Sequence, residues 1–424
     1  MRSFRFVHTA DIHLDSPLRG LSGHEGGVAD RIRTATREAF DNLIGYTIDE
    51  QAAFIIIVGD LYDGEWRDYQ TGLFFARQMG RLAKARIPAF VLYGNHDAES
   101  QITRRLELPE NVKAFSARKP ETFTLEELRV ALHGQSFRQR DVTDNLVPAY
   151  PEPIASVFNI GVLHTGLGGM GGHANYAPCT LDDLVNKGYH YWALGHVHQG
   201  SVLHERPHVV FPGNLQGRHI RETGRKGACI VTVEDDEIAE VAPLHADVVR
   251  WAVIPVTVDG CGQTVDVVDL VRDAIEEAVA RDADGRLVAC RIELRGRTDI
   301  HDRLLASAEH LLAEVRGAAL GLGDEVAWVE RIVLATEPAL DPATLAARND
   351  ALGDLQRMLR DAREDAGLLE QMKADIGELV RRLPHEVRGD AEDAILKAAI
   401  KGDHAGLIDQ VTGYLMARIT GEDQ

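Results

Sequence analysis

The stretch ALGHVHQG at residues 193–200 places two histidines, His196 and His198, directly after an apolar run. At the end of an extended strand, residues two apart point to the same side, so the two imidazoles lie next to each other. A single histidine in such a place is most often a hydrogen-bonded core residue. Two adjacent imidazoles instead favour a cation between them, if other strands bring matching donors to the same place.

Four other apolar runs in the first 250 residues also end in side chains that bind metal ions. These runs lie at 4–10, 52–59, 87–94 and 158–164. Because strand-like runs alternate with helical segments here, we expect an α/β sheet covered on both faces. The carboxyl ends of its strands form the rim where such sheets place their sites. The candidate ligands at that rim are Asp11, His13, Asp60, Asn95, His164, His196 and His198.

All of these candidates offer oxygen or nitrogen atoms, and together they exceed the needs of one ion. A tetrahedral site takes about four ligands, so the set predicts two divalent metal ions per chain that share a bridging carboxylate. Paired ions about 3.5–4 Å apart activate water and neutralise the charge that develops in phosphoryl transfer. The absence of sulfur donors favours Mn²⁺, with Fe or Zn as alternatives. His96 lies beside the amide ligand and suits a general acid, supported by the neighbouring Asp97.

Composition and charge limit the classes of protein to consider. A chain of 424 residues predicts two or three domains, and its longest apolar runs are far shorter than the about 20 residues that span a bilayer. We therefore expect no membrane association, and the start of the chain does not resemble a signal peptide. Four scattered cysteines without a CxxC pair predict a reducing compartment, the cytoplasm. The net charge of −20 is the wrong sign for a protein that coats nucleic acid electrostatically.

The pattern of apolar residues divides the chain into three predicted parts. Residues 1–250 carry the candidate site and form an α/β domain. Residues 251–336 follow the order βαβαβ and predict a small α/β capping domain. Residues 337–424 are mostly helical, with apolar residues at helical spacing. This helical tail either packs within the chain or docks to a partner.

Two further motifs lie near the predicted rim. GLGGMG at 166–171 matches a dinucleotide-binding fingerprint by letter, but Pro178 follows and no helix is expected there, so we favour an active-site loop. GRHIRETGRK at 217–226 is basic, and its Arg218, His219 and Arg221 are candidate contacts to DNA phosphates. A solvated loop paired with nearby acids is the alternative.

Several other polar residues have more ordinary interpretations. His8 is expected to be a core residue of the first strand, and Asp15, Asp63 and Asp97 are expected to cap turns or support ligands. Arg104 and Arg105 are a weaker suggestion of phosphate contacts than the basic segment.

The motifs DxH, GDxxD, GNHD, an isolated strand-end histidine and GHxH occur in this order and resemble those of the calcineurin-like metallophosphoesterases. The stretches HTADIHLDSPLRGL and FPGNLQGRHIRETGRKG resemble the SbcD/YhaO-like bacterial DNA-repair exonucleases. The likeness is good over residues 1–250 and looser beyond. It implies an α/β sandwich of two β-sheets flanked by helices, followed by a small α/β capping domain and a helical C-terminal tail.

The resemblance also implies roles for individual residues. One metal ion would take Asp11, His13, Asp60 and His198, and the other Asp60, Asn95, His164 and His196, with His96 as the catalytic histidine. The family further implies Mn²⁺-dependent cleavage of DNA phosphodiesters. It implies a homodimer whose C-terminal helices attach to an SMC-like coiled-coil ATPase.

Three hypotheses about function therefore stand side by side. The first is a two-metal DNA exonuclease or endonuclease in break repair. The second keeps the site but acts on small phosphoesters, cyclic nucleotides or phosphoproteins, which the net charge of −20 favours. The third is a non-catalytic metal-bound scaffold, against which the intact ligand set and His96 argue.

Overall fold

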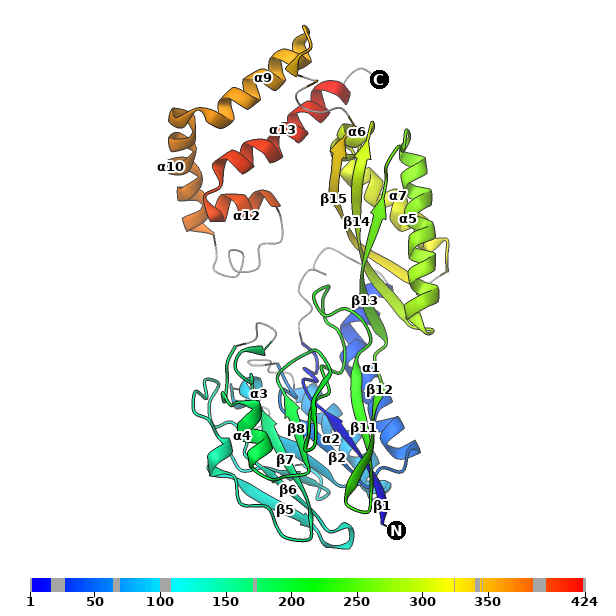
Figure 1. Cartoon of the computed structure of the whole chain (residues 1–424). Helices are drawn as coiled ribbons and strands as arrows, with labels where there is room; N and C mark the ends of the chain where they lie inside the picture. Colours follow the sequence, from blue (N-terminus) through cyan, green and yellow to red (C-terminus); the bar gives the residue numbers. More distant parts are fainter. Residues whose placement is uncertain are drawn as a thin grey trace. The chain divides into compact units, whose positions relative to one another are not determined.

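The chain divides into two compact units, Met1–Ala252 with Asp282–Ala289, and Val253–Arg281 with Cys290–Gln424 (Figure 1). The computed structural model describes residues 2–16, 27–63, 69–99, 108–170, 174–323, 325–339, 344, 346–383 and 394–421. All of the candidate ligands lie in the first unit.

The first sheet of this unit has six strands in the order β12-β11-β1-β2-β3-β4. Four of them run parallel, and β11 and β12 are antiparallel additions at one edge. The strands are β1 (Ser3–Thr9), β2 (Phe54–Val58), β3 (Ala89–Leu92), β4 (Val112–Ala114), β11 (Gly227–Glu234) and β12 (Glu237–His245). Apolar side chains of α1 (Gly27–Asp49) and α2 (Tyr69–Lys84) pack on its outer face.

The second sheet also has six strands, in the order β5-β6-β7-β8-β10-β9. Its inner four run parallel and its two edge strands are antiparallel. They are β5 (Glu121–Leu125), β6 (Val130–Gly134), β7 (Phe158–His164), β8 (Tyr191–Gly195), β9 (Ser201–Glu205) and β10 (His208–Phe211). The short α4 (Leu181–Asn186) packs on the outer face through Leu184. Single turns α3 (Asn95–Glu99), Glu126–Leu128 and Val147–Ala149 complete this part.

The central strands β2, β3, β7 and β8 are buried on both faces, which explains why they appear in the sequence as continuous apolar runs. In β2, Phe54, Ile56 and Val58 face the core between the sheets. Ile55 and Ile57 face the helices on the other side. The predicted α/β sandwich of two sheets flanked by helices is therefore confirmed.

The second unit contains two groups of helices and most of a three-stranded sheet in the order β13-β14-β15, whose strands β13 and β14 begin in the first unit. The strands are β13 (Val249–Thr257), β14 (Leu287–Thr298) and β15 (Ala327–Pro338), and the helices beside them are α5 (Thr264–Ala278), α6 (His301–Ala306) and α7 (Ala308–Leu320), with a π-helical turn at Val279–Ala283. The helix expected at 299–318 is interrupted at Ser307, which lies between the end of α6 at Ala306 and the start of α7 at Ala308.

The tail forms the helices α9 (Ala351–Glu364), α10 (Ala366–Arg382), α12 (Ala394–Lys401) and α13 (His404–Gly421). Helix α13 packs against α6, α9 and α12, and its Leu407 and Ile408 are buried. Part of the apolar tail is thus covered within the chain. Within the described residues, no helix is long and apolar enough to cross a membrane.

His8 links the two sheets of the first unit from the middle of β1. Its Nδ1 accepts a hydrogen bond from the Tyr191 hydroxyl (2.9 Å) and its Nε2 donates to the Leu194 carbonyl (3.0 Å), both on β8. The ring is completely buried, and this burial lowers the pKa of His8 from 6.5 to about 3. The expectation of a core histidine is confirmed.

The buried neutral His8 predicts a loss of stability in acid. In the unfolded chain His8 is protonated below about pH 6.5, whereas in the folded chain it stays neutral until about pH 3. The free energy of unfolding therefore decreases as the pH falls between these two values. The contribution of this one group is about 1.4 kcal/mol per pH unit. In urea titrations of the EDTA-treated protein, His8→Gln should therefore lose less stability than the wild type between pH 6.5 and 4. Parallel pH profiles for the two proteins would contradict this.

Candidate metal centre

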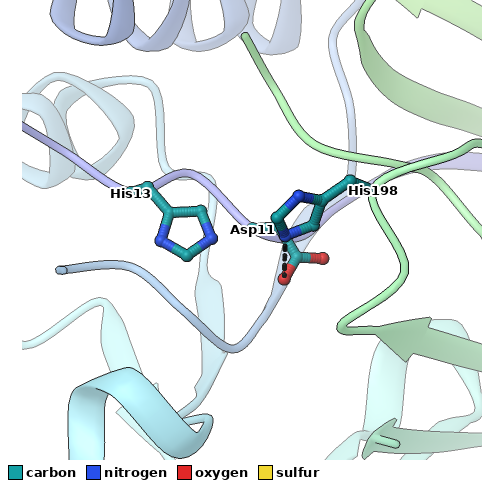
Figure 2. A group of neighbouring side chains, drawn as sticks. All are labelled: Asp11, His13 and His198. Carbon is teal, nitrogen blue, oxygen red and sulfur yellow. Dashed lines mark ion pairs between the residues drawn. The ribbon is translucent and has the colours of Figure 1, made fainter. Parts of the chain in front are cut away.

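The candidate ligands meet because five parallel strands end at one rim of the sandwich. The first sheet brings the ends of β1, β2 and β3, and the second brings the ends of β7 and β8. Asp11 and His13 follow β1, and the neighbouring His198 comes from the loop after β8 (Figure 2). The structure thus brings all seven predicted ligands to the same rim, and their role in binding metal stays a prediction.

Three groups of donors are spaced for metal ions; one of them, His13, Asp63 and His96, includes residues that were not predicted as ligands, and the other two consist of predicted ligands alone. Asp11, His13 and His198 form one, and Asp60, His164 and His196 form the other, with the donor atoms of each group within 4.8 Å of one another. In the first group, His198 Nε2 lies 3.8 Å from Asp11 Oδ1 (Figure 2). The ligand sets that the resemblance implies are divided in the same way.

Asp60 lies between the two groups. Its Oδ2 is 3.6 Å from His164 Nε2 and 3.9 Å from His13 Nε2. The Oδ1 atom of Asn95 lies 3.0 Å from the same His164 nitrogen. This placement fits a carboxylate that bridges two cations.

Buried polar atoms without partners support cation binding. Asp11 Oδ1 and both ring nitrogens of His13 are buried and have no hydrogen-bond partner among the described residues. Leaving such atoms unsatisfied is unfavourable, and each such group calls for an explanation. Burial and the charge of Asp60 raise the pKa of Asp11, and burial lowers the pKa of His13 so that its ring is neutral. A neutral imidazole and a carboxylate oxygen are the forms that bind metal ions, so the donors fit a dinuclear divalent centre.

The backbone turns sharply where the ligands leave their strands. Asp11, His13, Asp60 and His196 all have positive φ angles, of 49°, 47°, 51° and 102°. Residues other than glycine rarely adopt this conformation, and each instance costs about 1–3 kcal/mol. Four strained residues at one rim indicate that the surrounding fold holds their backbone in this conformation and so sets the direction of their side chains.

Gly59 allows the two sheets to approach each other at the centre. Its φ is +80°, and an added Cβ would lie 2.2 Å from His164 Nδ1. That nitrogen donates to the Val58 carbonyl at 3.1 Å, so the opposite nitrogen, Nε2, faces Asp60. Position 59 thus requires a glycine, because a larger residue would collide with the His164 ring. Without that collision, the Val58 carbonyl at the end of β2 can orient His164 on β7.

His198 is held by a carboxylate that the sequence analysis missed. Glu222 Oε1 accepts a hydrogen bond from His198 Nδ1 at 2.7 Å, and the Glu222 side chain is 5% exposed. The same carboxylate accepts from the Arg218 backbone N–H (2.7 Å) and from Asn214 Nδ2 (3.1 Å), while Lys226 Nζ donates to the His198 carbonyl (2.9 Å). Metal-binding histidines usually donate their second nitrogen to such a group. The signal in the sequence was a lone acid within the basic segment 217–226.

His96 forms a pair with Asp63 beside the donors. His96 Nδ1 lies 2.9 Å from Asp63 Oδ1, and the backbone N–H of His96 donates to Asp60 Oδ1 at 3.1 Å. Burial opposes the charged ring, but the hydrogen bond with Asp63 and the charge of Asp60 outweigh it and raise the pKa of His96 to about 9. The ring is 32% exposed, so a protonated His96 is accessible at the rim.

Asp97 supports the rim from inside the fold. Its buried carboxylate accepts hydrogen bonds from the backbone N–H groups of Leu61, Tyr62 and Gly94, at 3.2, 2.9 and 3.0 Å. Burial and the charge of Asp60 raise the pKa of Asp97 to about 7. The carboxylate therefore ties the end of β2 to the end of β3, as expected of a residue that supports ligands.

The candidate substrate-binding residues lie next to the Glu222 carboxylate. Arg218 donates to Ser16 Oγ (3.3 Å) and to Glu222 Oε1 (3.2 Å), while His219 is 43% exposed and Arg221 is exposed. Their contact with DNA stays a prediction. Arg104 and Arg105 lie outside the described residues. The described part of GLGGMG, 166–170, forms a turn, as expected of a loop.

Comparison with known proteins identifies the family. Residues 4–200 match the model of the calcineurin-like phosphoesterases, and residues 251–337 match that of the metallophosphoesterase YhaO, middle domain. The uncharacterized metallophosphoesterase YhaO of Bacillus subtilis is 37% identical over 295 residues, which cover 69% of this chain and 71% of that protein. This chain is a calcineurin-like metallophosphoesterase. The predicted resemblance to the YhaO branch is confirmed.

More distant relatives of this metallophosphoesterase include two Mre11 proteins. The DNA double-strand break repair protein Mre11 of Sulfurisphaera tokodaii is 26% identical over 272 residues, 60% of this chain and 66% of its own. The protein of the same name from Sulfolobus acidocaldarius is 23% identical over 317 residues, 71% of this chain and 77% of its own.

As a member of this family, the chain is a metal-dependent hydrolase of phosphoesters. Divalent ions, when bound, supply a Lewis acid and an activated water molecule. The chain supplies the rest: Asp60 joins the two groups of donors, and Glu222 and Val58 fix the orientation of two histidines. His96 holds a proton that Asp63 stabilises, which suits donation to a leaving oxygen.

The contact between Glu222 and His198 predicts a measurable effect on metal binding. Glu222→Gln removes the negative charge behind His198, so the affinity of one Mn²⁺ site should fall about 10–100-fold while the other changes little. Calorimetric titration with Mn²⁺ resolves the two sites. Glu240→Gln, an exposed change on β12, should bind like the wild type. Equal affinities for Glu222→Gln and the wild type would show that Glu222 does not support the site.

Proposed function

We propose that this metallophosphoesterase is a DNA exonuclease or endonuclease that acts in DNA repair and uses two Mn²⁺ ions per chain. The observation that carries the proposal is the extent of its similarity to the Mre11 proteins. That similarity covers 60% and 71% of this chain and so extends beyond residues 4–200, the part that matches the phosphoesterase family as a whole.

The donor set supports the choice of Mn²⁺. Carboxylate and amide oxygens suit this ion, and the candidate ligands include no thiolate, whereas the imidazoles also suit Fe and Zn. Fe and Zn share several of these donors. The metal content of protein purified without chelators distinguishes them.

The distribution of charge allows a polyanion to approach the rim. The chain carries a net charge of −20, but the segment 217–226 beside His198 is basic. Its exposed Arg221 and partly exposed His219 are available to contact phosphate groups. Bound cations would further reduce the repulsion between the rim and DNA.

The same charge also favours a second candidate function. A net charge of −20 repels long nucleic acids more strongly than small phosphoesters or cyclic nucleotides. The two functions use one site, so they differ in substrate and not in chemistry.

We further infer that the protein is cytoplasmic, forms a homodimer and binds an SMC-like coiled-coil ATPase through its helical tail. The binding of a partner by the tail is supported by a set of exposed apolar side chains on α9, α10 and α13, namely Met358, Leu368, Leu379, Val411 and Leu415. Helix α10 has no buried residue among those described. Such residues favour a partner that covers them.

A substitution on α10 tests the partner. Leu379→Asp places a charge at a side chain that is 65% exposed, so it should leave folding intact but weaken a complex with the ATPase at least tenfold. Co-purification of the two proteins from the source organism, followed by analytical ultracentrifugation, measures this. Unchanged assembly would place the partner elsewhere.

Replacement of His96 tests the catalytic proposal. His96→Gln removes the proton donor, so hydrolysis of labelled linear DNA in Mn²⁺ should slow by about 10²–10⁴-fold. The metal content should stay at two ions per chain, because His96 is not among the proposed ligands. Asp60→Asn, in contrast, should lose both metal and activity.

A parallel assay with a small chromogenic phosphodiester separates the hypotheses. Hydrolysis of this compound without degradation of DNA would favour the second candidate function. If neither compound reacted while two ions were bound, the scaffold hypothesis would replace both.

A further inference from the structure

The first unit contains a second hollow that takes no part in the metal centre. A cavity of about 280 Å³ lies where β9 and β10 of the second sheet meet β11 and β12 of the first. Apolar side chains such as Val210, Phe211 and Val241 line part of it. It is slightly below the range of about 300–1,000 Å³ that is typical of ligand pockets, so it fits a small molecule and not a strand of nucleic acid.

The lining of this cavity is basic, although the chain as a whole is acidic. Arg225, Lys226 and His245 all line it. The guanidinium of Arg225 and the ring of His245 have no hydrogen bond or ion pair with the described residues. Arg225 is exposed and His245 is half-buried, so both are within reach of an anion that enters from solvent. Together with Lys226 they make the lining of this cavity suitable for an anion.

The acids near the cavity are already engaged with other groups. Asp247 pairs with Arg250 at 2.9 Å and with Arg286 at 3.1 Å. Glu222 accepts hydrogen bonds from His198 and Arg218. Neither carboxylate is therefore free to neutralise Arg225.

A buried hydroxyl on the wall of the cavity also lacks a partner. Ser201 Oγ is shielded from solvent and forms no hydrogen bond with the described residues. Ser201, Arg225 and His245 all line the cavity, so their hydroxyl, guanidinium and imidazole groups are candidate donors to one oxygen-rich anion. Such a set suits a phosphate group, and the apolar wall suits an attached organic group.

The cavity lining continues from the loop that carries His198. Gln199, Gly200 and Ser201 of its lining follow His198 in the chain. Lys226 belongs to both places, because it lines the cavity and donates from Nζ to the His198 carbonyl at 2.9 Å. An anion in the cavity would compete with this carbonyl for the ammonium group.

We propose that this cavity is a binding site for a small phosphate monoester, separate from the metal centre and in contact with its His198 loop through Lys226. The phosphate binds Arg225, His245 and Ser201, and the organic group lies against the apolar wall. The identification of the organic group as a nucleoside rests on the proposed function, because a nuclease releases mononucleotides. The phosphate site itself does not depend on that function.

Equilibrium dialysis with the full chain after EDTA treatment tests the proposal. The probes are radiolabelled inorganic phosphate, dAMP, and a short oligonucleotide with a 5′-phosphate. The wild type should bind one dAMP per chain in a saturable way. Arg225→Ala should weaken this binding about tenfold or more, because it removes a charged donor. Arg206→Ala, an exposed change in the same region outside the cavity lining, is the matched control and should bind like the wild type.

The outcomes separate this proposal from the nuclease. Tighter binding of dAMP than of phosphate supports a mononucleotide as the occupant, whereas tighter binding of the oligonucleotide than of dAMP overturns a site for a small monoester. Binding that does not saturate, or that Arg225→Ala leaves unchanged, overturns the site. DNA hydrolysis with Mn²⁺ is measured separately, so either proposal can fail while the other holds.

Discussion

The structure of the first unit depends on the burial of two carboxylates, Asp11 and Asp60, at one rim between two sheets. Both are almost completely shielded from water, and each raises the energy of charging the other. Such a pair is unfavourable unless cations or hydrogen-bond donors surround it. Histidines from both sheets and the backbone N–H groups of His96 and His196 supply part of what is needed. The negative charge that these groups leave uncompensated explains why this rim fits two divalent ions.

The fold bears strain to bring these donors together. Ligands from β1, β2 and β8 leave their strands in left-handed conformations, and the tight approach at Gly59 excludes any side chain. Asp97 then holds the turns after β2 and β3 through three backbone hydrogen bonds. The packing of the helices and of the core between the sheets therefore stabilises backbone conformations at the site that these residues would not adopt by themselves.

The parts that could be predicted from sequence share one physical property. Strands buried on both faces appear as continuous apolar runs, and the polar residues that end them stand out, so β1, β2, β3, β7 and β8 were predicted from the sequence, and the candidate ligands that follow them lie at one rim. The short β4 and β5 are partly exposed and carry no such run, and β9 and β12 are edge strands with charged residues. Glu222 was missed for a different reason: its partner, His198, lies 24 residues away, and only the fold brings the two together.

The hydrogen-bond acceptors behind the three strand-end histidines differ between the two candidate metal sites. His164 and His196 donate their second nitrogen to backbone carbonyls, of Val58 and Ala174, whereas His198 donates to the carboxylate of Glu222. A carboxylate behind an imidazole favours cation binding more than a carbonyl does. Arg218 and Lys226 contact the same carboxylate and the same loop, and their positive charges oppose this effect. The basic segment 217–226 therefore joins the donors around His198 to the surface where a phosphate-bearing molecule would arrive.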